Sequence, residues 1–122
     1  MPPKKINIQA SADGIDEFWD PHILAELNGQ HIRLAKLKGE FVWHHHVEED
    51  EVFYVISGHL QIAFRDGNVD LMPGEMITIP RGVEHKPIAE DEVVVLLFEP
   101  ANTVNTGSAV DSDMTKHKMK RL

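Results

Sequence analysis

The chain has 122 residues, of which 42% are hydrophobic and 26% are charged, and this length fits a single domain with one core. It contains no cysteine, which excludes disulfides, thiolate metal ligands and cysteine nucleophiles and fits a cytoplasmic protein. A formal net charge of −8 argues against a nucleic-acid-binding surface. No apolar run approaches the length of a membrane-spanning helix, so we expect no membrane contact.

Short apolar runs separated by glycine and proline predict strands along most of the chain. The amino-terminal residues 6–9 are expected to form an edge strand. Asn28-Gly29 predicts a tight hairpin between strands at 22–27 and 31–37, because both turn positions take positive φ. Further strands are predicted over residues 42–46, 52–56, 60–64, 69–72, 76–79 and 93–98. This number of closely spaced strands predicts an all-β sandwich or small barrel.

Polar segments flank the predicted barrel. We assign residues 1–20 to an amino-terminal edge segment, 21–100 to the barrel, and 101–122 to a polar tail that lacks a core-facing pattern. The tail ends in a basic cluster, for which a solvated terminus is the favoured interpretation. The alternatives are contact with the acidic body of a neighbouring subunit and contact with an anionic surface. The basic side chains of this cluster are Lys116, Lys118, Lys120 and Arg121.

Three consecutive histidines lie on the predicted strand 42–46. Side chains alternate along a strand, so His44 and His46 share one face, about 7 Å apart, and can reach one metal ion. Glu51 follows after an acidic turn, and its carboxylate beside neutral imidazoles suits a divalent first-row metal. His85 follows a Pro-Arg-Gly turn and could reach the same barrel interior. Each of these residues alone could equally be an ordinary surface or loop side chain.

The joint spacing resembles the two sequence motifs of the cupin superfamily. In the first motif, His44-x-His46 is followed by four residues, Glu51, six residues and Gly58. In the second motif, Gly74, Pro80, Gly82 and His85 fall in register. Two positions depart from the patterns: Gly39 lies one residue too close to His44, and Ala89 replaces an expected asparagine.

This resemblance implies a cupin-type antiparallel β-barrel of the jelly-roll kind that holds a metal ion. The implied ligands are His44, His46, Glu51 and His85, whereas the neighbouring Glu48, Glu49 and Asp50 are loop charges. Iron, manganese, nickel or cobalt would leave positions open for a small molecule, and zinc or copper could also occupy such a site. Alternation along the strands predicts an apolar pocket lining of Val42, Phe53 and Val55, although core packing is the favoured role of these side chains.

Similarity to small cupins implies two classes of function. One is a metal-dependent enzyme, such as a dioxygenase or an isomerase, that acts on a small polar or aromatic molecule. The alternative is a non-catalytic cupin that binds or senses a metal or a small ligand. His45, Gln61 and Arg65 are possible polar accessories, and no side chain is assigned as a catalytic base. We also expect a homodimer, formed through the face that carries Tyr54 and Ile56.

Overall fold

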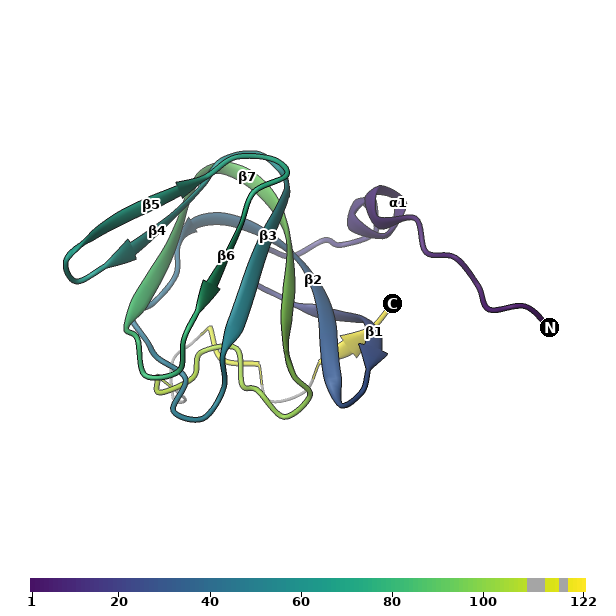
Figure 1. Ribbon diagram of the computed structural model, residues 1–122. Coiled ribbons are helices and arrows are strands. Elements are labelled where there is room, and N and C mark those ends of the chain that lie inside the picture. Colours follow the sequence, from purple (N-terminus) through teal and green to yellow (C-terminus); the bar gives the residue numbers. More distant parts are fainter. Residues whose placement is uncertain (110–113, 117–118) are drawn as a thin grey trace.

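The computed structural model describes residues 1–109, 114–116 and 119–122, and within these residues the secondary structure is almost entirely β (Figure 1). This confirms the expected all-β class. None of the described residues forms a helix that is long and apolar enough to cross a membrane. In chain order the elements are α1 (Ile8–Asp13), β1 (His22–Leu27), β2 (Gln30–Glu40), β3 (Glu51–Ser57), β4 (Leu60–Phe64), β5 (Gly67–Leu71), β6 (Met76–Ile79), β7 (His85–Pro100) and β8 (Lys120–Arg121).

The long strand β7 connects the two halves of the barrel. Its first residues pair antiparallel with β4, and its later residues pair with β2 on one side and β3 on the other. The described strands follow the order β5-β4-β7-β2-β1-β8, and β3 also pairs with β6. In Figure 1 the paired strands β6, β3, β7 and β2 lie side by side, and the sheet curls back through the first part of β7 to β4 and β5. The sheet therefore encloses an interior to which distant strands contribute side chains.

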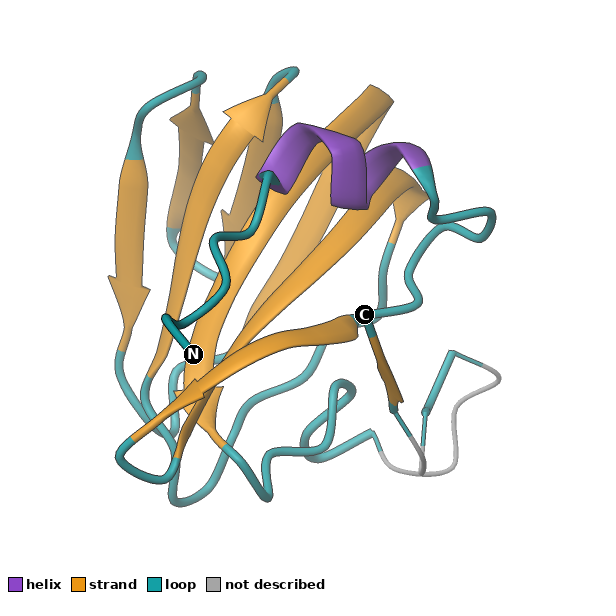
Figure 2. Cartoon of the chain, turned by 90° about the vertical axis from the view of Figure 1, so that its right-hand side faces the viewer, coloured by secondary structure: helices purple, strands orange, loops and turns teal. Residues whose placement is uncertain are grey.

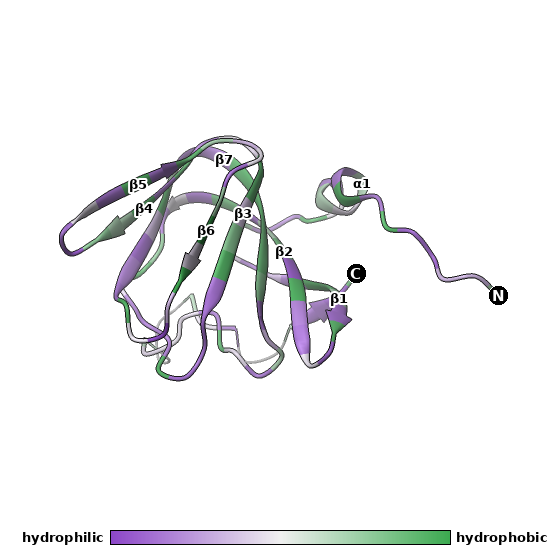
Figure 3. Ribbon diagram, viewed as in Figure 1, coloured by the Kyte–Doolittle hydropathy of each residue, from purple (hydrophilic) through white to green (hydrophobic). Residues whose placement is uncertain are grey.

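Two apolar clusters cover the two faces of the strands. The larger cluster fills the barrel interior with alternate side chains of β2, β3, β4 and β7, such as Leu37, Val55, Ile62 and Val95. The smaller cluster lies on the outer face, where Leu34 and Leu96 pack against residues of α1. Hydropathy agrees, since the middle of β3 and β7 is apolar whereas β5 is largely hydrophilic (Figure 3).

The predicted amino-terminal strand at residues 6–9 is wrong, because this segment leads into helix α1. Asn7 caps the helix by accepting a hydrogen bond from the Ala10 backbone N–H at 2.9 Å. Ile8 and Ala12 lie four residues apart and share one helical face, and Ile15 follows just after the end of the helix. Their contact with the outer apolar cluster explains why the helix lies against the outside of the sheet (Figure 2).

The Asn28-Gly29 hairpin is confirmed, with φ values of 51° and 81° at the two turn positions. In contrast, the predicted strand over residues 42–46 is wrong, because the segment makes only an isolated antiparallel bridge between His44 and His85. The strand predicted over 93–98 is longer than expected and begins at His85. The amino-terminal half of β7 was not predicted as a strand, because charged side chains interrupt its apolar residues.

The region after β7 has more buried residues than its polar sequence predicts. Thr103, Asn105 and Thr106 are buried, and the Asn105 side chain accepts a hydrogen bond from Lys116 N and donates one to Met114 O. Hydrogen bonds to buried backbone groups, rather than apolar contacts, hold this segment, so hydrophobic patterning could not identify it.

The described part of the basic cluster contacts the acidic body of the same chain. The Lys116 ammonium lies 3.6 Å from Glu17 and 3.8 Å from Asp20, and the Lys120 ammonium lies 3.8 Å from Asp20. Arg121 pairs with Glu26, and β8 runs parallel to β1. Lys118 lies outside the described residues. The described basic side chains are therefore not simply solvated, although exposed ion pairs of this kind add little stability each.

Candidate functional site

One loop and two strand ends bring the predicted metal ligands together. His44 and His46 lie in the connection between β2 and β3, Glu51 begins β3, and His85 begins β7. Two backbone hydrogen bonds join His44 to His85, at 3.1 and 2.9 Å, and Gly82 N donates to His46 O at 2.8 Å. The backbone bridge therefore replaces the strand that we expected to carry the histidines.

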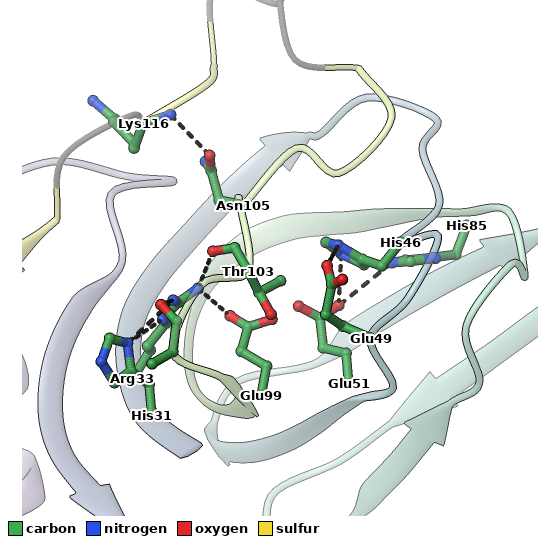
Figure 4. A network of polar contacts seen from close by, with 11 residues as sticks. His31, Arg33, His46, Glu49, Glu51, His85, Glu99, Thr103, Asn105 and Lys116 are labelled. Carbon is green, nitrogen blue, oxygen red and sulfur yellow. Dashed lines mark hydrogen bonds and ion pairs between the residues drawn. The ribbon is translucent and has the colours of Figure 1, made fainter. Parts of the chain in front are cut away.

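The four side chains form a compact buried group. Each offers a nitrogen or oxygen atom, and these atoms lie within 4.8 Å of one another. All four residues are at most 3% exposed. Glu51 Oε1 lies 3.5 Å from both His46 Nε2 and His85 Nε2. Figure 4 shows these two contacts as dashed lines. At 3.5 Å none of the three atoms has a hydrogen-bond partner, although buried polar atoms normally do.

Backbone carbonyl groups orient two of the imidazoles. Val42 O lies 2.9 Å from His44 Nδ1, and Val83 O lies 2.9 Å from His85 Nδ1. A carbonyl can only accept, so we assign the ring proton to Nδ1 in both residues. Nε2 then carries the lone pair and faces the centre of the group, which is the arrangement that a metal ligand requires.

The electrostatics of the group favour neutral imidazoles beside an ionised carboxylate. Burial and the neighbouring His85 lower the pKa of His44 to about 4, so this imidazole is neutral at pH 7. Burial opposes ionisation of Glu51, but the adjacent polar groups of Glu99, His46 and His85 hold its pKa well below the ordinary value. These are the ionisation states in which both residue types bind metals.

A small cavity of about 30 Å³ adjoins two of the four ligands, His44 and Glu51, and has room for roughly two water molecules. Of the three predicted lining residues, Phe53 lines this cavity. Val42 and Val55 belong to the interior apolar cluster and are not among the lining residues. The cavity is lined by Trp19, Pro21, Ala35, Leu37, Phe41, His44, Glu51, Phe53, Pro87, Leu97, Glu99 and Asn105.

The proposed polar accessories lie elsewhere. Arg65 stacks over the Trp43 ring at 3.8 Å and pairs with Glu84 on the surface. The His45 backbone is bound to Ser108, and Gln61 lies on β4. None of the three lines the cavity beside the ligands.

Sequence reasoning missed a buried ion pair on the cavity wall. Arg33 on β2 donates to Glu99 Oε1 on β7 at 2.7 Å, and both side chains are 1% exposed. Burial and the nearby Glu51 carboxylate raise the pKa of Glu99 well above its ordinary value. The alternation of side chains along the two strands could have revealed this pair, because it places both charged residues on the interior face of otherwise apolar strands. In the observed register Arg33 pairs with Leu97, and Glu99 pairs with His31.

A different acidic side chain contacts the ligand group from outside the cavity. Glu49 Oε1 lies 4.0 Å from His46 Nδ1, on the side of His46 that faces a surface depression. Gly107 packs closely against the histidine segment. A Cβ added at this position would lie 2.3 Å from His45 O and 3.0 Å from His46 Nδ1. Glycine is thus required for the segment after β7 to approach the histidines so closely.

Comparison with known proteins identifies relatives of this chain. Residues 30–99 match the family model of the cupin domain (Cupin_2). YdbB, an uncharacterized protein of Bacillus subtilis, is 34% identical over 97 residues, which cover 79% of this chain and 86% of YdbB. The crystal structure of a cupin-2 domain containing protein from Shewanella frigidimarina has 48% identity and a TM-score of 0.77, and the match covers 78% of this chain and 93% of that protein.

An enzyme is also among the relatives. Acireductone dioxygenase of Bacillus cytotoxicus is 33% identical over 79 residues, which cover 61% of this chain. The match spans only 46% of the dioxygenase, so the similarity is to part of that enzyme.

The lowered pKa of His44 predicts that the metal-free protein loses stability in acid. Unfolded His44 takes up a proton below about pH 6.5, whereas the folded side chain stays neutral down to about pH 4. We expect the free energy of unfolding of the wild type, minus that of His44→Gln, to decrease by about 3 kcal/mol from pH 7 to pH 4. Urea unfolding with EDTA present measures this difference. A constant difference across the window would contradict the neutral state of His44.

Proposed function

We propose that this chain, which belongs to the cupin domain family, is a metal-dependent enzyme that acts on a small molecule. The observation that carries the proposal is the group of three imidazoles and one carboxylate, whose donor atoms lie within 4.8 Å and are buried. Three of these atoms lack any hydrogen-bond partner, and a bound cation would satisfy all of them. The donor set therefore fits a divalent transition metal.

His44, His46, Glu51 and His85 would hold the ion. When bound, a divalent metal supplies a Lewis-acid centre at which a small molecule can be polarised and oriented. Nitrogen and oxygen donors without thiolates suit iron, manganese, nickel or cobalt, and zinc or copper would also bind.

Other residues of the chain control the surroundings of the centre. The Val42 and Val83 carbonyls keep the rings of His44 and His85 in position. Trp19, Phe41 and Phe53 give the cavity apolar walls that exclude water. These walls favour a small ligand that is bound mainly through its polar atoms.

Oxygen-dependent chemistry is our first choice of reaction. It is supported by the similarity to acireductone dioxygenase and by the nitrogen-oxygen donor set, which suits iron. The alternative, a cupin that binds or senses a ligand without turnover, shares the same metal group. Turnover therefore has to be measured directly.

Metal content tests the ligand group. We expect anaerobically purified wild-type protein to contain about one transition-metal ion per chain, and Glu51→Ala and His85→Ala to lose most of it, because three remaining ligands bind far more weakly. Elemental analysis measures the content. His45→Ala is the matched control, since this neighbouring histidine lies outside the donor group and should leave the content unchanged.

Circular dichroism establishes that each variant is folded before its metal content is compared. Full retention of metal in folded Glu51→Ala or His85→Ala would remove that residue from the ligand set.

Oxygen consumption tests the reaction. We expect protein reconstituted with Fe(II) to consume oxygen when given one of a panel of acireductone, small diols, catechols, thiols and keto acids, and Glu51→Ala to consume none above background. An oxygen electrode measures the rate. Binding of a panel member without consumption of oxygen or change in the molecule would favour the non-catalytic alternative.

We further propose that the protein acts as a homodimer in the cytoplasm. Apolar side chains remain on the outer face of the sheet beside the part that α1 covers: Phe98 is 36% exposed and pairs with Val52 and Ile32, which are half-buried on the same face. Tyr54 and Ile56 pack on the outer cluster next to this patch. A second copy could cover such a patch. The lack of cysteine fits a reducing compartment.

Light scattering tests the dimer. We expect a mass of twice the 13.8 kDa of one chain for the wild type, and a shift toward one chain for Phe98→Glu, because a charge would be buried in the interface. Val69→Glu is the matched control, since Val69 is 37% exposed but lies on β5, away from the patch. A wild-type mass of one chain, or equal effects of both substitutions, would contradict the proposed interface.

A further inference from the structure

Glu99 places a second carboxyl group on the wall of the cavity, outside the four-residue donor group. The residue is 1% exposed and lies near the end of β7, on the interior face of the barrel. Its Oε1 accepts from Arg33 at 2.7 Å, whereas its Oε2 is buried and has no hydrogen-bond partner. Together with His44 and Glu51, it lines the cavity. Figure 4 shows Glu99 between Arg33 and Glu51.

Arg33 holds this carboxyl group in a fixed position. The guanidinium also donates to Thr103 O at 2.8 Å and to Ala101 O at 3.0 Å, and it contacts His31 Nδ1. These bonds leave the arginine little freedom to rotate, so Glu99 cannot turn its second oxygen toward another donor without losing the ion pair. Glu99 also lies beside the Glu51 carboxyl group, and a buried carboxyl oxygen without a hydrogen-bond partner costs stability.

The remaining cavity wall offers few polar alternatives. Most of the lining side chains are apolar, and the Asn105 amide is already engaged with Met114 O and Lys116 N. Among the described lining residues outside the donor group, Glu99 Oε2 is the buried side-chain polar atom that has no hydrogen-bond partner.

We propose that Glu99 is a ligand-positioning residue that hydrogen-bonds through Oε2 to a hydroxyl group of the molecule held at the metal, so that the site selects small hydroxyl-bearing ligands. This inference rests on the proposed metal-dependent function. A hydroxyl group can donate to a carboxylate or accept from a carboxylic acid, so the contact forms in either state of Glu99. The small cavity restricts the ligand to a few non-hydrogen atoms.

Two small anions that differ by one hydroxyl group test this selection. Glycolate and acetate both bind metals through a carboxylate, but only glycolate carries the hydroxyl. The protein is loaded with Co(II), whose visible absorption changes when its ligands change, and each anion is titrated. The measured quantity is the ratio of the two dissociation constants, which removes any general change in metal or anion affinity.

Three variants separate positioning from structure. Arg33→Met together with Glu99→Met removes both members of the ion pair, so that no unpaired buried charge threatens folding. We expect the preference for glycolate over acetate to fall about tenfold in this variant. Glu99→Gln, which keeps a hydrogen-bonding group, should retain most of the preference. Glu92→Gln is the matched control, because this carboxyl group lies on the same strand β7 but is exposed and outside the cavity, and should leave the preference unchanged.

The outcomes are distinguishable. A Co(II)-loaded double variant that keeps the wild-type preference would overturn the role of Glu99, as would an equal fall in Glu92→Gln. Wild-type protein that fails to bind Co(II), or whose spectrum neither anion changes, would instead overturn the proposed function and this inference with it. That failure appears in the wild type before any variant is compared.

Discussion

The course of β7 is the constraint on which the rest of the structure depends. This one strand begins with His85, which lies in the ligand group, and reaches Glu99 near its far end. Its pairing with β4, β2 and β3 brings together parts of the chain that are far apart in sequence. Because side chains alternate along the strand, the same register that buries Val93, Val95 and Leu97 also turns Glu99 into the interior.

Burial of so many ionisable groups in one interior must be compensated. Glu51 and Glu99 are neighbouring carboxyl groups in a poorly solvated site: burial and Glu51 raise the pKa of Glu99, whereas contact with Glu99, His46 and His85 holds the pKa of Glu51 well below its ordinary value. Arg33 offsets part of this cost for Glu99, and the imidazoles around Glu51 offset part for that residue. Three of the buried atoms that remain without a partner, His46 Nε2, His85 Nε2 and Glu51 Oε1, are those that a cation would satisfy, so the electrostatic balance of the barrel and its proposed chemistry are linked.

Local sequence patterns predicted the parts of the fold that local physics decides. The Asn28-Gly29 turn follows from the positive φ that both positions tolerate, and the alternating strand β4 follows from its apolar period. The two strand predictions that were wrong failed because contacts with other parts of the chain determine the conformation of these segments. Residues 6–9 lead into a helix because Asn7 caps it and the outer cluster covers its apolar face, and His44 pairs with a residue 41 positions away instead of joining a strand.

The four donor residues can be identified as a group from the amino-acid sequence, because their spacing matches two motifs and their side chains have metal-binding chemistry. How they converge, and which side chains surround them, follows from the packing of the barrel. Arg33 and Glu99 are 66 residues apart, and Asn105 lies in a segment without an apolar pattern. No local sequence pattern therefore predicts that these residues meet beside the site. The physical reason is that strand pairing, not sequence proximity, selects which side chains share a barrel interior.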